Sequence, residues 1–218
     1  MKERPILMSA PMVRAILDGT KTQTRRVVKP TMTAPKVAPL HMEPWIIDGE
    51  QEIDDHGLPC WSGFHPDYPG EAKWFSCPYG GIGERLWVRE THALVPMTAY
   101  RASDGVQQTI DPNDPDHAAI YRAGWDRSDP GTRWRPSIFM PRWASRITLE
   151  ITDVRVQRVQ EITVEDAMHE GITAPMLNDK YSTMRGGFSI LWDEINAARG
   201  YDWASNPWVW ALTFRRVI

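Results

Sequence analysis

The pattern of hydrophobic residues near the N-terminus predicts a strand followed by a helix. Residues 5–9, Pro-Ile-Leu-Met-Ser, form a short apolar run typical of a buried strand. Pro11 then stands where the first turn of a helix tolerates proline, and Gly19 stands where a helix is often capped at its C-terminus. The apolar residues that recur between them at helical spacing are Met12, Val13, Ile16 and Leu17. The basic segment 21–29 therefore begins where this helix ends and leads into a strand.

A second regular pattern follows Gly83. Residues 86–93, Leu-Trp-Val-Arg-Glu-Thr-His-Ala, predict one strand with polar residues on both faces. One face would carry Leu86, Val88, Glu90 and His92, and the other Trp87, Arg89, Thr91 and Ala93. This distribution indicates a polar pocket beside the strand.

The C-terminal part begins with a long alternating segment. Ile147, Leu149 and Ile151 alternate with polar residues. Val154 and Val156 resume the alternation one residue out of phase, as a bulge would produce. The segment therefore predicts a long, bent strand suited to a small barrel.

Two helices and a final strand are predicted after it. Thr163 followed by Glu165 and Asp166 is typical of a capped helix start, and Gly171 marks the end of that helix just after Glu170. A further helix, ending near Gly200, is predicted by the apolar spacing of Phe188, Leu191, Trp192 and Ile195. Asn206-Pro207 then turns the chain into a strand over residues 208–214.

Two stretches break this regularity. Residues from about 30 to 80 and from about 98 to 135 are rich in Pro, Gly and Asp, which predicts two long loop-rich insertions with short irregular strands. At 218 residues the chain could form one elaborated core or two small domains, so length alone leaves the domain count open. The sequence motifs favour a single α+β domain over residues 1–218.

Composition narrows the class of protein. With 42% hydrophobic and 24% charged residues, the chain has the balance of a globular protein. It has no run of eighteen apolar residues, and its N-terminal apolar stretch is too short for a signal peptide, so we expect a cytoplasmic protein without a membrane partner.

The cysteine content argues against a metal or a disulfide framework. Cys60 and Cys77 are the two cysteines, and in the cytoplasm they are expected to be thiols. With His56 and His65 they could hold a metal, but the spacing matches no standard zinc pattern. We therefore expect no metal and no cofactor.

The charge balance limits nucleic-acid binding to local contacts. A net charge of −3 excludes broad electrostatic attraction to a duplex. Nineteen of the 25 cationic residues are Arg, which suits planar or bidentate recognition better than a diffuse positive field.

Reactive and charged side chains are most concentrated in the segment Gly19–Arg26, whose sequence is Gly-Thr-Lys-Thr-Gln-Thr-Arg-Arg. On a strand, Thr22, Thr24 and Arg26 would point the same way, with Lys21 close enough to fold over them. A desolvated lysine beside a hydroxyl can act as base and nucleophile. The alternative is a solvated basic turn without chemistry.

The same segment resembles the signature of the ASCH family. Gly19, Lys21 and Arg26 fill its Gly-x-Lys-x-x-x-x-Arg pattern. Further similarity to the long ASCH proteins of phages and prophages lies, in the family's order, at residues 83–90, 140–146, 163–171 and 206–210. The resemblance covers about half of the chain and leaves out the two insertions. It implies a PUA-like fold, a small mixed β-barrel flanked by a few helices and associated with RNA binding and with reading modified bases.

The resemblance also implies an activity. Small bacterial ASCH amidohydrolases that deacetylate 4-N-acetylcytidine use a lysine, a threonine and a glutamate, which fall on Lys21, Thr24 and Glu170. Glu170 would end a short helix, where the macrodipole disfavours an anion and raises proton affinity. The expected roles are base for Lys21, nucleophile for Thr24 and general acid for Glu170.

Weaker candidates for substrate binding come from several segments. They are Thr22, Arg26, Trp87, Arg89, Glu90, Arg142 and Arg146. Arg26 could instead hold the barrel closed, and Arg89 and Glu90 could pair with each other. The expected partner is a modified nucleoside or single-stranded nucleic acid. Two other functions stay open: a base-reading RNA- or DNA-binding module without catalysis, and an ASCH-type ribonuclease. The sequence does not indicate an oligomeric state.

Overall fold

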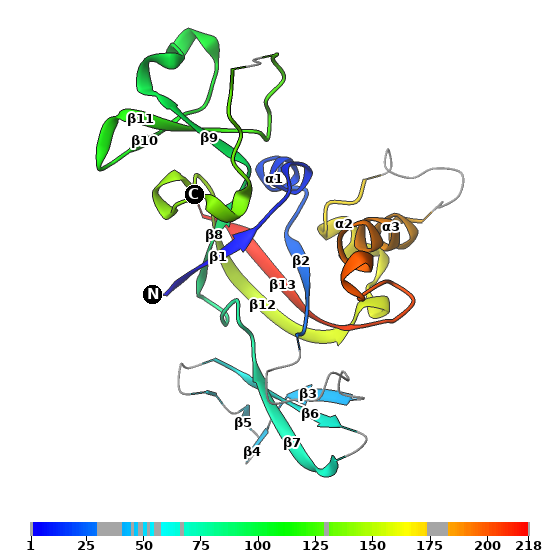
Figure 1. Ribbon diagram of the computed structural model, residues 1–218. Helices are drawn as coiled ribbons and strands as arrows, with labels where there is room; N and C mark the ends of the chain where they lie inside the picture. The colour runs from blue at the N-terminus through cyan, green and yellow to red at the C-terminus, as the bar shows by residue number, and fades with distance from the viewer. Residues whose placement is uncertain are drawn as a thin grey trace. The chain divides into compact units, whose positions relative to one another are not determined.

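The fold was analysed in a computed structural model of the chain (Figure 1). It describes residues 2–29, 41–44, 46–47, 50–51, 53–54, 58–65, 68–128, 131–173 and 183–217. His56 lies outside these residues. The described residues combine several sheets with three α-helices, so the predicted α+β class is confirmed.

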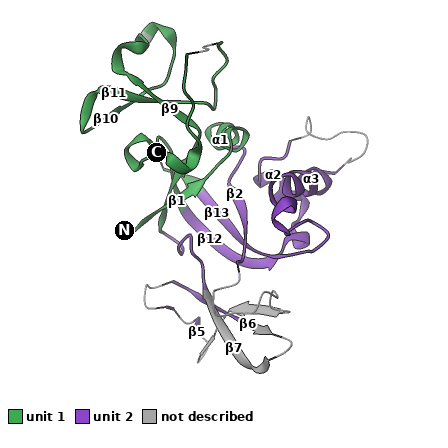
Figure 2. Ribbon diagram, viewed as in Figure 1, with its two compact units in different colours: residues 1–19, 84–150, 215–218 green, residues 20–83, 151–214 purple. Residues whose placement is uncertain are grey.

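Two compact units divide the chain, and each is built from separate segments (Figure 2). Unit 1 comprises Met1–Gly19, Glu84–Glu150 and Arg215–Ile218, and unit 2 comprises Thr20–Gly83 and Ile151–Phe214. Two long strands, β12 (Thr148–Arg158) and β13 (Trp208–Arg216), have residues in both units. The single domain over residues 1–218 stays a prediction.

Unit 1 begins with the predicted strand and helix. β1 (Glu3–Leu7) pairs in parallel with β8 (Arg85–Arg89), from Glu3↔Arg85 to Leu7↔Arg89. β8 in turn pairs antiparallel with the first three residues of β12. α1 (Ala10–Leu17) follows β1, with Val13 and Ile16 buried, and Gly19 after it has a φ of 77°. Glycine adopts this left-handed conformation at no steric cost, which confirms the predicted helix end.

The single strand predicted over residues 86–93 was wrong, because the chain changes partner at Glu90. β8 ends at Arg89, and the Glu90 N–H donates to the Met140 sulfur at 3.2 Å instead of to a neighbouring strand. β9 (His92–Pro96) then pairs antiparallel with β11 (Asp114–Tyr121), which pairs with β10 (Thr109–Asp111). Alternation continues through the break, so the pattern alone could not reveal it.

Unit 2 contains the other strands of the main sheet and two helices. β13 pairs antiparallel with β2 (Gln23–Val27), from Val209↔Val27 to Thr213↔Gln23. α2 (Val164–His169) starts at Thr163, whose hydroxyl accepts from the Asp166 N–H, and α3 (Met184–Asn196) starts at Thr183. The core between helices and sheet consists of Val159, Ile162, Ala167, Ile172, Phe188, Trp192 and Val209. The predicted long strand, both helices and the final strand are thus confirmed.

The predicted insertions contain short regular elements. Within about 30–80 lie β3 (His41–Pro44), β4 (Ile46–Ile47), β5 (Glu50–Gln51), β6 (Cys60–His65) and β7 (Tyr68–Ser76). They form a three-stranded sheet, β3-β6-β7, and a two-stranded pair, β4-β5. Single 3₁₀ turns complete the described structure: η1 (Met97–Ala99), η2 (Ala102–Asp104), η3 (Ser137–Phe139), η4 (Arg142–Ala144), η5 (Val159–Glu161) and η7 (Ala197–Arg199).

The main sheet has the strand order β1-β8-β12-β13-β2 and is mixed, because β1 and β8 pair in parallel whereas β8 with β12, and β13 with β2, pair antiparallel. Across the part of the chain that the structure describes, no pairing joins β1 to β2, so these strands form an open sheet. None of the described helices combines the length and the apolar character needed to cross a bilayer.

Candidate functional site

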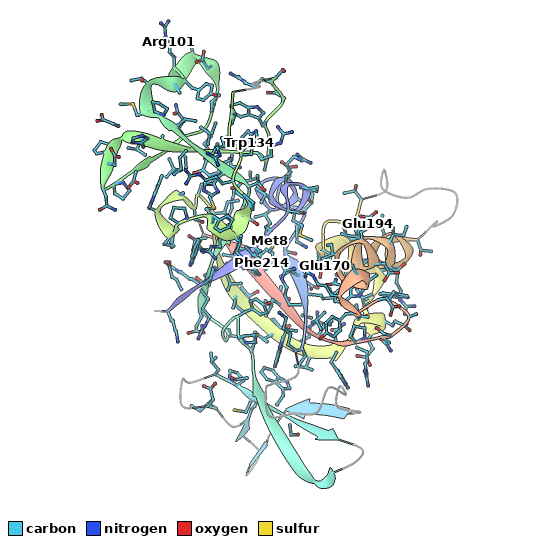
Figure 3. All side chains as sticks on the ribbon, in the orientation of Figure 1. Met8, Arg101, Trp134, Glu170, Glu194 and Phe214 are labelled. Atoms are coloured by element: carbon cyan, nitrogen blue, oxygen red, sulfur yellow. The ribbon has the colours of Figure 1, made fainter. Side chains whose placement is uncertain are left out.

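A buried polar cluster in unit 2 joins the segment before β2 to the end of α2. Lys21 forms an isolated antiparallel bridge with Glu170, and the Thr22 N–H donates to the His169 carbonyl at 2.8 Å. Glu170 is the C-cap residue of α2, as expected (Figure 3). These backbone contacts bring together two side chains that are 149 positions apart.

Lys21 is the centre of the cluster. Its Nζ donates to Glu170 Oε2 at 2.7 Å and to the Glu170 carbonyl at 2.9 Å. The Lys21 side chain is 0% exposed and that of Glu170 4% exposed, so water does not screen the pair. Burial lowers the pKa of the Lys21 amine from its ordinary value, against the opposing effect of Glu170. A lysine with a lowered pKa reaches its neutral, basic form more readily than an exposed lysine.

Arg25 binds the other oxygen of the same carboxylate, a contact that the sequence analysis did not identify. Its Nη1 donates to Glu170 Oε1 at 3.0 Å, and its Nη2 donates to Asp166 Oδ2 at 2.8 Å. Nη1 also lies 3.3 Å from Gln23 Oε1. The Arg25 guanidinium therefore fixes the carboxylates of Asp166 and Glu170 against β2. Each Glu170 oxygen accepts a hydrogen bond from a cation, Oε2 from Lys21 and Oε1 from Arg25.

Asp166 anchors the cluster to the helix. Its Oδ1 accepts from Arg155 Nη2 at 3.2 Å, and its N–H donates to Thr163 Oγ1 at 3.0 Å. Burial would raise the pKa of Asp166, but Arg25 and Arg155 outweigh burial and lower it. Asp166 is thus a firmly ionised partner for Arg25.

Two sequence signals point to this cluster. Lys21, Gln23 and Arg25 are spaced by two residues, which places them on one face of an extended chain. Asp166 and Glu170 are spaced by four, which places them on one face of a helix. The expectation that Lys21 folds over the side of the chain carrying Thr22, Thr24 and Arg26 hid the first of these signals.

Thr24 is buried, and its hydroxyl is unsatisfied. The residue is 1% exposed, and its Oγ1 has no hydrogen-bond partner within the described residues. Alternation along β2 places Thr24 on the face opposite Gln23 and Arg25. An unmade hydrogen bond of a buried hydroxyl costs about 1–3 kcal/mol. Thr24 thus retains a polar atom for which the described fold supplies no partner.

Thr22 and Arg26, which lie two positions before and after Thr24, are partly exposed. Thr22 contributes the backbone bond to His169 described above. Arg26 Nη1 donates to the Arg25 carbonyl at 3.4 Å. Desolvation lowers the pKa of Arg26, whereas Tyr79 and Glu170 raise it, so the guanidinium lies within electrostatic range of the Glu170 carboxylate. Arg26 therefore belongs to the surroundings of the cluster.

The other substrate-binding candidates belong to unit 1. Glu90 is buried, the Arg146 side chain is 7% exposed, and the two bind each other through two hydrogen bonds, Nε to Oε1 at 2.9 Å and Nη2 to Oε2 at 3.0 Å. Arg146 also lies 4.0 Å from the centre of the Tyr121 ring. Glu90 thus pairs with Arg146 rather than with Arg89, the partner considered from the sequence.

Arg89, Arg142 and Trp87 form a second contact group in unit 1. Arg89 Nε donates to the Met140 carbonyl at 3.1 Å, and Arg142 Nε donates to Glu3 Oε2 at 2.8 Å. Their guanidinium carbons lie 4.9 Å and 5.8 Å from the Trp87 ring centre. The Trp87 residue is 8% exposed. Each of these side chains already has a partner within the fold.

Cys60 and Cys77 are buried thiols, and no group of three or more His, Cys, Asp or Glu side chains converges within the described residues.

Comparisons of the chain with models of protein families, with curated proteins and with solved structures found no match.

Proposed function

We propose that this chain is an amidohydrolase that removes an acyl group from the exocyclic amine of a modified cytidine or a similar nucleoside, with Lys21, Thr24 and Glu170 as catalytic residues. The observation that carries the proposal is the fully buried contact of 2.7 Å between Lys21 Nζ and Glu170 Oε2. The resemblance to the ASCH amidohydrolases selected these two residues, and the fold brings them into direct contact.

Lys21 would act as the base. Burial lowers the pKa of Lys21, and nearby Arg25 and Arg26 lower it further, so part of the amine is neutral at a pH where an exposed lysine is charged. A neutral amine accepts a proton from a threonine hydroxyl during nucleophilic attack. The environment of Lys21 thus supports the role that the resemblance implies.

Thr24 would act as the nucleophile. As Oγ1 bonds to the acyl carbon, its proton passes to Lys21, and the C–N bond then breaks as the exocyclic nitrogen gains a proton. Water subsequently hydrolyses the acyl-threonine, which releases the acid and restores the hydroxyl. Lys21 and Thr24 share no hydrogen bond in the described structure, and alternation puts them on opposite faces of the chain. The proposal therefore requires the backbone at Lys21, which precedes β2, to turn the amine toward Thr24 when substrate binds.

Glu170 would return the proton to the leaving amine. The hydrogen bond from Lys21 Nζ to Glu170 Oε2 offers a direct route for the proton that Lys21 takes from Thr24. Arg25, on the other carboxylate oxygen, holds Glu170 in place during the transfer. The protons of the acyl transfer then balance without an outside acid.

A PUA-like arrangement is part of the proposal, with the described main sheet open rather than closed into the barrel that the resemblance implies. Support comes from the mixed main sheet, the long strands β12 and β13, and the helices α2 and α3 that pack on it in unit 2. The substrate would be a modified nucleoside, free or within a single strand. Because Lys21 and Thr24 are buried, the site must open to admit the acyl carbonyl.

The test is mass spectrometry of 4-N-acetylcytidine, and of an acetylated oligonucleotide, after incubation with the purified protein. Wild type should remove one acetyl mass without added metal, and Lys21→Ala should not. Lys29→Ala is the matched control, because Lys29 is an exposed lysine of the same segment. It should retain activity.

Two results would reject the proposal. Equal activity of wild type and Lys21→Ala would remove the base from the mechanism. Intact acetyl groups on both substrates would exclude deacetylation. Shortened oligonucleotide products would identify a nuclease instead, and unchanged nucleic acid that is bound by the protein would identify a base-reading module.

A further inference from the structure

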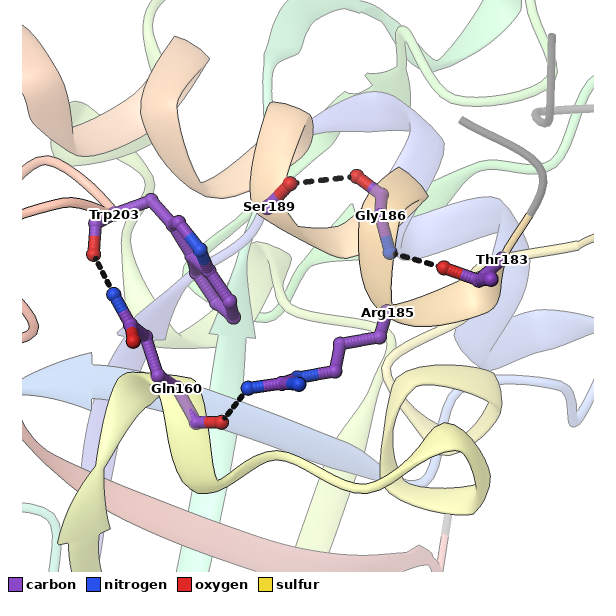
Figure 4. Close-up of a pocket in the computed structure, with 6 residues that line it drawn as sticks. All are labelled: Gln160, Thr183, Arg185, Gly186, Ser189 and Trp203. Carbon is purple, nitrogen blue, oxygen red and sulfur yellow. Dashed lines mark hydrogen bonds between the residues drawn. The ribbon is translucent and has the colours of Figure 1, made fainter. Parts of the chain in front are cut away.

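A second candidate site in unit 2 is a cavity between the start of α3 and the residues around Trp203 (Figure 4). It is an open hollow at the surface rather than an enclosed cavity, with a volume of about 400 Å³. It is lined by Gln160, Thr183, Arg185, Gly186, Ser189 and Trp203. The lining contains one cation, one large aromatic ring, an amide and two hydroxyls, and no carboxylate.

Arg185 is the cation of this cavity. Its guanidinium donates to the Gln160 carbonyl and lies 5.7 Å from the centre of the Trp203 ring. Among the described residues it contacts no carboxylate, although a guanidinium carries five N–H donors. Most of its donors therefore remain available to an anion. Thr183 already caps α3 by accepting from the Gly186 N–H at 3.1 Å, so the positive charge of the cavity is that of Arg185.

Trp203 forms one side of the cavity, and contacts with neighbouring residues fix its position. Its backbone N–H donates to Asp193 Oδ1, and its backbone carbonyl accepts from Gln160 Nε2 at 2.8 Å. Its ring meets Phe188 edge to face, with the ring centres 6.2 Å apart. A ring that is fixed before a ligand arrives loses little conformational freedom on binding.

From this combination we propose that the cavity binds one nucleotide, with the base against the Trp203 ring and the phosphate on the Arg185 guanidinium. A flat ring beside a guanidinium that contacts no carboxylate among the described residues fits a ligand that is both planar and anionic. Base stacking on an aromatic side chain tolerates every base, and arginine binds phosphate in a planar, bidentate manner. Gln160 and Ser189 also line the cavity, and their Nε2 and hydroxyl donate to the Trp203 and Gly186 carbonyls, so these groups shape the cavity rather than supply further donors.

The nucleotide could be a free mononucleotide or one residue of a single strand, because both present the same base and phosphate. The Lys21 cluster belongs to the same unit but shares no residue with the cavity. Nucleotide binding here therefore does not require the proposed hydrolysis, and each can fail without the other.

The test is isothermal titration calorimetry of the full chain with three probes: cytidine, cytidine 5′-monophosphate and a short oligocytidylate. The monophosphate should bind about ten-fold more tightly than cytidine, because only it can use Arg185. Arg185→Gln should remove this difference and leave cytidine binding unchanged. Trp203→Phe should weaken both ligands a few-fold, because it reduces ring area without changing charge.

Matched controls separate the cavity from general charge effects. Arg14→Gln removes an exposed helical arginine that also has no carboxylate partner among the described residues, and it should bind all probes as wild type does. Lys21→Ala should also bind normally. Stronger binding of the oligocytidylate than of the monophosphate, lost in Arg185→Gln, would identify a strand as the ligand, and the reverse order a free nucleotide.

The proposal is overturned if none of the probes binds, if cytidine and its monophosphate bind equally well, or if Arg185→Gln binds the monophosphate as wild type does. Arg185 is exposed, so its replacement leaves the core intact. A lost preference for phosphate in Arg185→Gln therefore reports the cavity and not a folding defect.

Discussion

Lys21 Nζ lies 2.7 Å from Glu170 Oε2 and 2.9 Å from the carbonyl oxygen of the same residue. One ammonium group therefore binds both the side chain and the backbone of the residue that ends α2. Since the Lys21 side chain is 0% exposed, its charge depends on this neighbour and on Arg25 and Arg26 rather than on water. A change in the protonation state of Lys21 therefore directly changes the electrostatic environment of the Glu170 carboxylate.

The first prediction concerns the pH dependence of stability. Burial lowers the pKa of Lys21 below its ordinary value of 10.5, so between the lowered value and 10.5 the unfolded chain binds more protons at this residue than the folded chain. Stability contributed by this group therefore rises with pH across that window. Urea unfolding of wild type and Lys21→Met should show this rise in wild type only.

Subtracting the Lys21→Met curve removes the titration of all other groups. Lys29→Met serves as the control, since Lys29 is exposed and should leave the slope unchanged. If the difference between wild type and Lys21→Met is flat up to pH 10.5, or falls with pH, the lowered pKa of Lys21 is wrong.

The second prediction compares how much Arg25 and Arg155, the two arginines that bind Asp166, contribute to the free energy of unfolding. The Arg25 side chain is 0% exposed and bridges Asp166 and Glu170, whereas that of Arg155 is 41% exposed. Arg25→Met removes the buried cation that Asp166 and Glu170 share, and it should cost about 3–5 kcal/mol of unfolding free energy. Arg155→Met breaks a partly exposed pair and should cost at most about 1 kcal/mol.

Denaturant unfolding of the two variants, beside Arg25→Lys, checks this order. Arg25→Lys keeps the charge but not the planar fork that reaches both carboxylates, so it should recover only part of the loss. Similar stabilities of Arg25→Met and Arg155→Met would show that the bridge between Asp166 and Glu170 does not hold the cluster together.

Much of this arrangement could be predicted because it depends on local patterns. The hydroxyl of Thr163 and the glycine at 171 mark the two ends of α2, and these signals put Glu170 at its C-terminal cap. The contact between Lys21 and Glu170 is different. It depends on a backbone bridge between two residues that are 149 positions apart in the sequence. Hydrophobic periodicity carries no information about such a bridge, and only the family resemblance suggested that these two residues belong together.

The errors have equally specific causes. Alternation over residues 86–93 is continuous, but hydrogen bonds to Met140 and Arg135 redirect the backbone after Arg89. Arg146 could not be assigned as the partner of Glu90, because their 56-residue separation in sequence is bridged only by folding. Period-two patterns indicate which residues share a face, but not which segment lies against that face.

The third prediction tests whether Glu90 and Arg146 are structural. The pair is buried and doubly hydrogen-bonded, so removing one partner leaves an uncompensated charge. Glu90→Met and Arg146→Met should each lose about 3–5 kcal/mol, whereas the double variant should be closer to wild type than either single variant. A double-mutant cycle from urea unfolding measures this coupling.

Activity of the double variant completes that test. If the pair only supports unit 1, the double variant should deacetylate as wild type does once it is folded. Loss of substrate binding at unchanged stability would instead restore the role in substrate recognition that the sequence indicated for both residues.

The last prediction uses the unsatisfied hydroxyl of Thr24. Because Thr24 Oγ1 is buried without a partner in the described structure, Thr24→Val replaces it by a methyl group of similar shape and removes an uncompensated polar group. Folding should become about 1 kcal/mol more favourable, while deacetylation should vanish with the nucleophile and return in Thr24→Ser. Unfolding and mass spectrometry on the same samples measure both effects. An active Thr24→Val would exclude Thr24 as the nucleophile, and a destabilised one would show that the hydroxyl has a structural partner after all. If the Thr24 hydroxyl had only a structural role, its removal would lower stability. A gain of stability together with a loss of activity would therefore indicate that Thr24 is retained for function, because functional sites are where a fold tolerates unsatisfied polar groups.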